Sequence, residues 1–241
     1  MNTVVLKGLV GSHAYGYATE ASDQDWMSVY VADLDNYFGL KNSKSTQTLS
    51  ENEDNVSYEF TKFVSLCSNF NPNVVPLLFL KSYPVETSKL GVSLLSVRKA
   101  FLTQKAYNSL MGYAVSQENK ATKNLTGTLG TKRKELVDRY GYDVKSAAHT
   151  VRLMELAKHL FKYNEVRLDL SAEVCAEYRM GKYSVDDFMN HFQSLKEEVN
   201  LAFSNTTLPE SVDMEYVNRF CVNALSEWFF GRNIESDNGL V

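Results

Sequence analysis

The chain has 241 residues, of which 44% are hydrophobic and 22% are charged, and its formal net charge is −4. This length and apolar content suit one large domain or two small ones with a real core, and they exclude general disorder. A net charge this close to zero also excludes a chain that is basic throughout. Any contact with nucleic acid must therefore come from a local patch.

The three cysteines, Cys67, Cys175 and Cys221, are far apart, and each stands among apolar residues. This pattern favours buried, reduced thiols over a disulfide framework or a zinc site. The first residues lack the long apolar run of a signal peptide, and no stretch approaches the ~18 apolar residues expected of a membrane helix. We therefore expect a cytoplasmic protein that makes no membrane contact.

The first 60 residues predict strands and turns. Residues 4–10 are rich in β-branched residues and end at a Gly-Ser pair, and residues 26–31 give a second strand signal. Residues 41–55 are polar and predict a loop. Residues 56–60 predict a short third strand.

Beyond residue 60 the apolar residues follow helical spacing. We expect a helix from Phe60 that is broken at Asn71-Pro72-Asn73. Further helices are expected over residues 88–119 and 143–163, after the N-cap Ser184, and between Pro209 and Gly231. The pattern predicts an α+β protein, with a small α/β unit over residues 1–85 and a helical unit over residues 86–241.

The most informative motif is Gly11-Ser12, then ten intervening residues, then Asp23-Gln24-Asp25 at the start of the second expected strand. Alternate residues of a strand point to the same face, so Asp23 and Asp25 can present their carboxylates side by side. Adjacent carboxylates repel unless a cation lies between them. Mg²⁺ is the usual cation, because it binds hard oxygen ligands and keeps positions for phosphate and water. The motif predicts a metal site with one or two ions, and a solvated turn that starts a strand is the alternative.

Residues near this motif extend the candidate site. A third carboxylate commonly completes such a site from a neighbouring strand, and Glu59 is the best candidate. The small residues Gly11 and Ser12 let the backbone approach a triphosphate and form an anion nest. Ser12 adds a hydroxyl donor. His13 either contacts phosphate or base, or it caps the local structure.

Two groups of basic residues are candidates for phosphate contacts. Lys145, His149 and Arg152 recur at i, i+4 and i+7, so they share one helix face. That face suits a triphosphate or an acceptor phosphate, and a solvated polar face is the alternative. Residues 120–134 predict a basic mobile loop that either follows an RNA backbone or is only solvated. The cations of this segment are Lys120, Lys123, Lys132, Arg133 and Lys134.

The segment from Gly8 to Gly16, together with Ser22-Asp23-Gln24-Asp25, resembles the DNA polymerase beta-like nucleotidyltransferase superfamily. Within it, the chain is most similar to the RNA repair pathway DNA polymerase beta family of bacteria and phages. Three later segments resemble the same family: residues 58–63 its third-acid segment, residues 71–73 its NPN turn, and residues 141–153 its helical signature. The chain departs from the family where Trp26-Met27 follows the second acid in place of Gly-Val, and where Glu59 replaces Asp.

The resemblance implies a polymerase beta-like nucleotidyltransferase core followed by an all-helical domain. It also implies Mg²⁺, with Mn²⁺ as the alternative ion, a nucleoside triphosphate donor and release of pyrophosphate. By position, the catalytic metal ligands would be Asp23, Asp25 and Glu59, and the nucleotide-binding residues would be Gly11, Ser12, His13, Lys145, His149 and Arg152. We expect the acceptor to be the 3′ end of an RNA such as tRNA, in repair. A protein or small-molecule acceptor, or a non-catalytic nucleotide-binding module, is the alternative.

Overall fold

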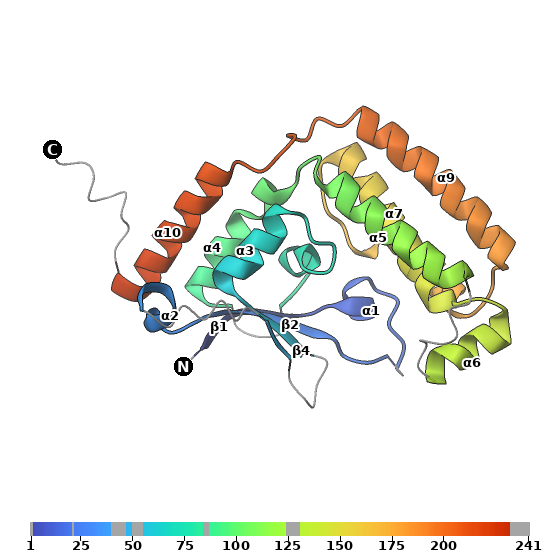
Figure 1. Cartoon of the computed structure of the whole chain (residues 1–241), viewed down its shortest axis with the longest axis horizontal. Helices are drawn as coiled ribbons and strands as arrows, with labels where there is room; N and C mark the ends of the chain where they lie inside the picture. The colour runs from blue at the N-terminus through green and yellow to red at the C-terminus, as the bar shows by residue number, and fades with distance from the viewer. Residues whose placement is uncertain are drawn as a thin grey trace. The chain divides into compact units, whose positions relative to one another are not determined.

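The computed structural model describes residues 2–20, 22–39, 47–49, 55–83, 87–123 and 131–231, without the side chains of residues 47–49, 131 and 132 (Figure 1). Contacts divide the chain into two compact units. The sheet unit comprises Met1–Gly11, Asp23–Thr103 and Ser211–Val241, and the helical unit comprises Ser12–Ser22 and Gln104–Glu210. The chain therefore passes from one unit to the other within the Gly-Ser and Asp-Gln-Asp motif.

Among the described residues, the sheet unit holds a four-stranded mixed sheet in the order β1-β2-β4-β3. Its strands are β1 (Thr3–Leu9), β2 (Trp26–Val31), β3 (Gln47–Leu49) and β4 (Asn55–Glu59). β2 pairs antiparallel with β1 and parallel with β4, and β3 pairs antiparallel with β4. From Met27 to Val31 every side chain of β2 is buried, as expected for a strand that is paired on both edges.

Helices contact this sheet from later parts of the chain. α3 (Phe60–Ser68) packs on β2 and β4, and α4 (Lys89–Ser96) packs on β1. α3 buries Phe60, Phe63, Val64 and Cys67, which is the apolar stripe that its sequence predicts. The remaining helical elements of the sheet unit are α2 (Leu34–Phe38), η1 (Val75–Phe79), η2 (Arg98–Phe101) and α10 (Met214–Phe230).

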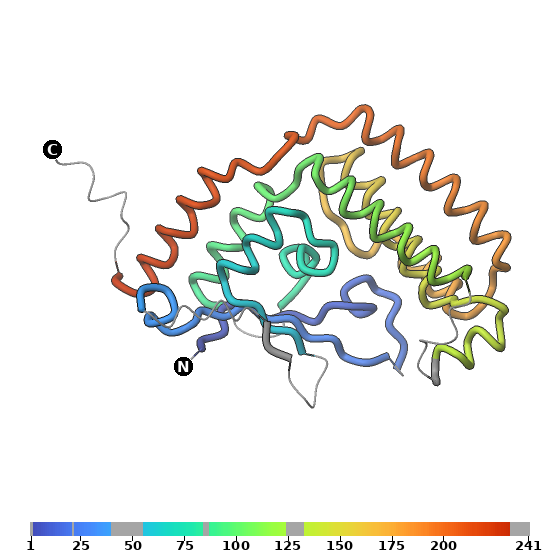
Figure 2. Tube along the Cα trace, in the orientation of Figure 1, coloured from blue at the N-terminus to red at the C-terminus, as the bar shows by residue number. Residues whose placement is uncertain are grey.

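The helical unit is built around one long helix, α7 (Val144–Tyr163). Its other described elements are α1 (Gly11–Ala14), apart from Gly11, α5 (Ala106–Thr122), α6 (Thr131–Tyr140), η4 (Asp169–Ser171), α8 (Ala172–Arg179) and α9 (Val185–Ser204). α7 contacts α5, α8 and α9, and α5 and α9 run along it (Figure 2). In the part of the chain that the structure describes, no helix is long and apolar enough to cross a membrane.

The α+β class, three of the strands and the long helices agree with the sequence predictions. Two predicted loops are wrong in part. β3 lies inside the polar segment 41–55, because its backbone pairs with β4 whatever its composition. Lys120 belongs to α5, and residues 131–134 form the first turn of α6. The rest of both predicted loops lies at residues 41–46, 50–54 and 124–130, outside the described residues.

The division into units differs from the single boundary expected near residue 85. The sheet unit continues to Thr103 and also takes α10 from the far end of the chain. Aromatic contacts bring α10 there: Phe220 lies 6.3 Å from Phe60, and Phe229 lies 5.5 Å from Tyr37, between ring centroids. Contacts between residues this distant in sequence leave no local signal by which to place the boundary.

Asp143 anchors the first turn of α7, and we expect its replacement by alanine to destabilise the helical unit by about 2 kcal/mol or more. Its carboxylate is 1% exposed, accepts hydrogen bonds from the backbone N–H groups of Lys145 and Ser146, and lies 3.5 Å from Arg133 Nε. The exposed N-cap Ser184 of α9 is the matched control, and Ser184→Ala should cost about 1 kcal/mol. Urea unfolding of both variants measures the difference, and equal losses would contradict the role of burial.

Candidate functional site

The turn after β1 places the Asp25 carboxylate against the backbone of Gly11. The antiparallel ladder continues past the last strand pair, because Val10 N–H donates to the Asp25 carbonyl at 2.8 Å. Gly11 has φ +61°, and a Cβ atom added there would lie 2.0 Å from Asp25 Oδ2. A side chain at position 11 would therefore collide with the carboxylate as well as strain the backbone. Glycine is needed here for both reasons.

Asp23 and Asp25 lie just before β2, not within it. Asp25 is half-buried and is tied to Val10 through its own backbone, whereas Asp23 is exposed. The sequence prediction of a shared face assumed that both acids lie within a strand. Because Asp23 lies before β2, strand alternation does not fix the direction of its side chain. The structure brings Asp25 to the Gly11 turn and leaves Asp23 two residues away on an exposed segment.

Glu59 lies at the opposite end of the β2–β4 pair from Asp25. In the parallel register, Trp26 is opposite Asn55 and Tyr30 is opposite Glu59. Five residues of strand separate Asp25 from the level of Glu59, which corresponds to about 16 Å. The structure thus does not bring Glu59 together with Asp25.

The contacts of Glu59 are those of a helix cap. Its carboxylate accepts hydrogen bonds from the N–H groups of Thr61 and Lys62 at the start of α3 and from the Tyr37 hydroxyl. Burial, followed by this hydrogen bond to Glu59, raises the pKa of Tyr37 well above its ordinary value, so the phenol stays a donor. These bonds stabilise α3 and occupy both carboxylate oxygens.

The motif supplies carboxylate oxygens, which are the ligands that a divalent metal such as Mg²⁺ prefers. Within the described ranges, no three or more His, Cys, Asp or Glu side chains gather in a way that could hold a metal ion. Mg²⁺ is, however, commonly bound by one or two carboxylates together with substrate phosphates and water. Asp23 and Asp25 fit that smaller donor set, which also suits Mn²⁺. Glu59 does not belong to it.

Ser12 and His13 begin the helical unit, in the four-residue helix α1 (Gly11–Ala14). The segment turns sharply after α1, because Gly16 N–H donates to the His13 carbonyl and Tyr17 N–H donates to the Ser12 carbonyl. Ser12 and His13 are half-buried. Among the described residues, buried His13 Nε2 has no hydrogen-bond partner.

Lys145, His149 and Arg152 share a face of α7 that runs from solvent into the core of the helical unit. Lys145 is exposed, His149 is half-buried and Arg152 is 7% exposed. The inner part of this face is therefore not the solvated surface that the alternative interpretation required. The sequence places polar residues on this face without showing that Arg152 is buried and His149 half-buried.

Arg152 lies between aromatic residues that its position on the helix does not reveal. Its guanidinium carbon is 4.0 Å from the centroid of the Tyr15 ring, and its Nη2 donates to His149 Nε2. The Tyr113 ring meets His149 edge-on, with centroids 5.0 Å apart. Tyr15, at 2% exposure, looks like a packing residue in the sequence, and the only hint of another role is its place inside the motif.

The charge state of His149 follows from these surroundings. Burial, and then the positive charge of Arg152, lowers the pKa of His149 to about 2, with smaller effects from Arg133, Lys120 and Lys145. The imidazole is therefore neutral near pH 7. Because a guanidinium has no acceptor, Nε2 must accept the hydrogen bond from Arg152. His149 orients Arg152 and carries no charge for phosphate binding.

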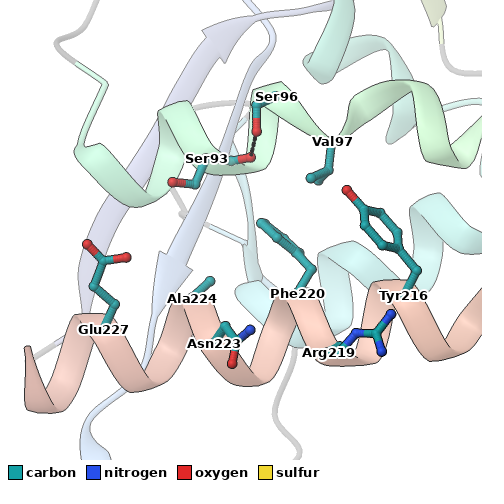
Figure 3. Close-up of a pocket in the computed structure, with 9 residues that line it drawn as sticks. All are labelled: Ser93, Ser96, Val97, Tyr216, Arg219, Phe220, Asn223, Ala224 and Glu227. Atoms are coloured by element: carbon teal, nitrogen blue, oxygen red, sulfur yellow. Dashed lines mark hydrogen bonds between the residues drawn. The ribbon is translucent and has the colours of Figure 1, made fainter. Parts of the chain in front are cut away.

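A groove of about 320 Å³ between α4 and α10 is a separate feature of the sheet unit (Figure 3). Ser93, Arg219 and Glu227 supply polar groups, and Phe220 points into the groove. None of the predicted site residues lines it. The groove is therefore not part of the carboxylate motif.

Gly11→Ala should destabilise the sheet unit more than a glycine substitution with backbone strain alone. Gly231 is the matched control, because it has φ +67° in the same unit and no described atom lies within 4 Å of an added Cβ. We expect Gly231→Ala to cost about 1 kcal/mol. Gly11→Ala should cost at least ~1 kcal/mol more, since Asp25 must also move. Equal shifts in a denaturation experiment would show that Asp25 does not pack on Gly11.

His149 should make the helical unit acid-sensitive. Its pKa is about 2 in the folded protein, against 6.5 for an unperturbed histidine, so below pH 6.5 the unfolded chain takes up a proton that the folded chain does not. Stability from this group is complete above pH 6.5 and falls with pH by up to ~1.4 kcal/mol per unit. In His149→Gln the decline between pH 6.5 and 5 should be shallower in urea titrations. His159→Gln, a change at a less buried histidine, should alter the slope less, and a slope unchanged in His149→Gln would refute the assignment.

Comparison with known proteins adds a family to this geometry. No curated protein and no solved structure matches the chain. The family model of the RNA repair pathway DNA polymerase beta family, RlaP, matches residues 2–178, from β1 into α8. This range is more than half of the chain and contains every predicted site residue. The chain belongs to the RNA repair pathway DNA polymerase beta family.

Proposed function

We propose that the protein is a metal-dependent nucleotidyltransferase, which moves a nucleoside monophosphate from a nucleoside triphosphate to an acceptor hydroxyl. The observation that carries the proposal is the Asp25 carboxylate held against Gly11, in a chain of a polymerase beta family. Both residues are half-buried, so the turn is firmly packed and still accessible to solvent. A solvated turn would not need a glycine in contact with a carboxylate.

In the proposed reaction, the acceptor oxygen forms a bond to the α-phosphorus of the nucleotide. The bond between that phosphorus and the pyrophosphate oxygen breaks, pyrophosphate leaves, and the acceptor proton passes to a carboxylate or to water. Asp23 and Asp25 would hold Mg²⁺ or Mn²⁺, which when bound supplies Lewis-acid stabilisation of the phosphate oxygens. The backbone of Gly11 and Ser12, with His13, would contact the nucleotide from the turn.

Positively charged side chains of the helical unit favour the binding of a substrate with several phosphate groups. Lys145 and Arg152 would bind phosphate oxygens, with His149 orienting Arg152. Three further lysines are exposed at the end of α5 and the start of α6: Lys120, Lys123 and Lys134. Family membership and these lysines together favour an RNA acceptor, and we propose the 3′ end of a tRNA-like molecule.

Transfer of label from each α-labelled nucleoside triphosphate, with Mg²⁺, to total tRNA and separately to lysate protein tests the proposal. We expect label on RNA with the wild-type protein and at least ~100-fold less with Asp25→Asn or Asp23→Asn, because the metal ligands stabilise charge by several kcal/mol. Asp35→Asn, at an exposed acid of the same unit on α2, is the control and should retain activity.

Label on protein alone would support the nucleotidyl transfer reaction and show that the acceptor is a protein and not an RNA. Nucleotide binding without transfer to either acceptor would indicate a binding module. Glu59→Gln separates the cap from a metal ligand: it should lower stability by about 1 kcal/mol and leave transfer within a few-fold of wild type. A ~100-fold loss of transfer in folded Glu59→Gln would instead indicate that Glu59 is a metal ligand.

A further inference from the structure

Arg152 is a buried cation for which the described residues supply no counter-ion. Its side chain is 7% exposed, and no carboxylate of the described residues lies within ion-pair distance of it. Its Nη2 donates to His149, and its ring contact is with Tyr15. Its buried Nε–H finds no hydrogen-bond acceptor in the described part of the chain. A buried charge of this kind is costly unless an anion joins it.

The groups packed around Arg152 are neutral near pH 7. They come from the segment after α1, from α7 and from α8: Tyr15, Tyr17, His149 and Cys175. Burial raises the pKa of both Tyr15 and Tyr17, and it raises that of Cys175 to about 11. Burial, then Arg152, keeps His149 uncharged. None of these neighbours carries a negative charge that would pair with the guanidinium.

The carboxylates of the same helix and its cap are engaged elsewhere. Glu155, one turn after Arg152, lies 2.8 Å from Lys158. Asp143 caps α7 and pairs with Arg133. Lys120 and Lys145 add positive charge around His149, and Arg179 adds it near Tyr17. The local field therefore favours an anion from outside the protein.

Two further orphaned polar groups lie in the motif segment of the same unit. The Tyr15 hydroxyl and His13 Nε2 are buried and have no hydrogen-bond partner among the described residues. Tyr15 already touches Arg152 through its ring. Along the same face of α7, exposure decreases from exposed Lys145 through half-buried His149 to Arg152.

We propose that Arg152 is the centre of a phosphoryl-binding site contained in the helical unit, which binds its anion without a divalent metal, with Tyr15 as a partner and His149 as a positioning residue. The inference rests on the proposed function, because the proposed transfer reaction identifies the compounds that would supply the phosphoryl group. That source is either the polyphosphate of a nucleotide or a terminal phosphate of an RNA. Both offer the same oxygens to a guanidinium fork.

The test is equilibrium binding in EDTA, by calorimetry and by thermal shift, to the full-length protein. The probes are tripolyphosphate, ATP, and a short RNA with either a 3′-phosphate or a 3′-hydroxyl end. We expect a metal-free probe to bind the wild type and to bind Arg152→Met about 10- to 100-fold more weakly. Arg167→Met, which removes an exposed arginine of the same unit, is the control for net charge and should bind as wild type.

Anion binding at Arg152 should not depend on the carboxylates of Asp23 and Asp25. The double variant Asp23→Asn/Asp25→Asn should therefore still bind the metal-free probes. His149→Gln can still accept from Arg152 and should retain more affinity than His149→Leu, which cannot. Preference for tripolyphosphate and ATP assigns the site to the nucleotide, and preference for the 3′-phosphate RNA assigns it to the RNA end. Either preference supports the proposal if it is lost in Arg152→Met.

Several outcomes would overturn the inference. These are no metal-free binding by the wild type, equal binding by folded Arg152→Met, and equal affinity of the two His149 variants. If Arg152→Met does not fold, the wild-type titration and the comparison of His149→Gln with His149→Leu still test the proposed site. Label transfer with Mg²⁺ is measured separately: transfer without metal-free binding refutes only this inference, and metal-free binding without transfer refutes only the proposed enzyme activity.

Discussion

The pairing of β2 on both edges is the constraint that determines where each acid of the motif can lie. Its antiparallel ladder with β1 extends to the Val10–Asp25 hydrogen bond and brings Asp25 onto Gly11. Its parallel ladder with β4 carries Glu59 to the other end of the strand. One register therefore places one carboxylate at the turn and excludes another from it.

In the helical unit, burial determines the environment of each basic residue, as strand pairing determines the position of each acid in the sheet unit. α7 packs against α5, α8 and α9, so its face with Lys, His and Arg changes from exposed at Lys145 to buried at Arg152. The Asp143 cap stabilises the start of this helix, and the stacked Tyr15 ring and the neutral His149 hold the Arg152 guanidinium. A guanidinium retained in such a setting is typical of a binding group, because an apolar residue would pack there at less cost.

Local features of the fold were predictable because they depend on neighbouring residues. The N-cap Ser184 with its Asp187 partner and the C-cap Gly231 mark helix ends through contacts within one turn. The apolar stripe of α3 follows from helical spacing alone. β3, by contrast, could not be predicted, since a three-residue edge strand depends on its pairing with β4.

By itself, the sequence determined the α+β class, the long helices, the glycine turn and the pair of acids before β2, because periodicity, capping and motif spacing are local properties. Only the tertiary structure decided that Glu59 caps α3, that α10 belongs with the sheet, and that Arg152 is buried with no counter-ion among the residues described. Strand register and burial arise from contacts between distant residues. The environment of a charge, and hence its chemistry, is determined by those contacts.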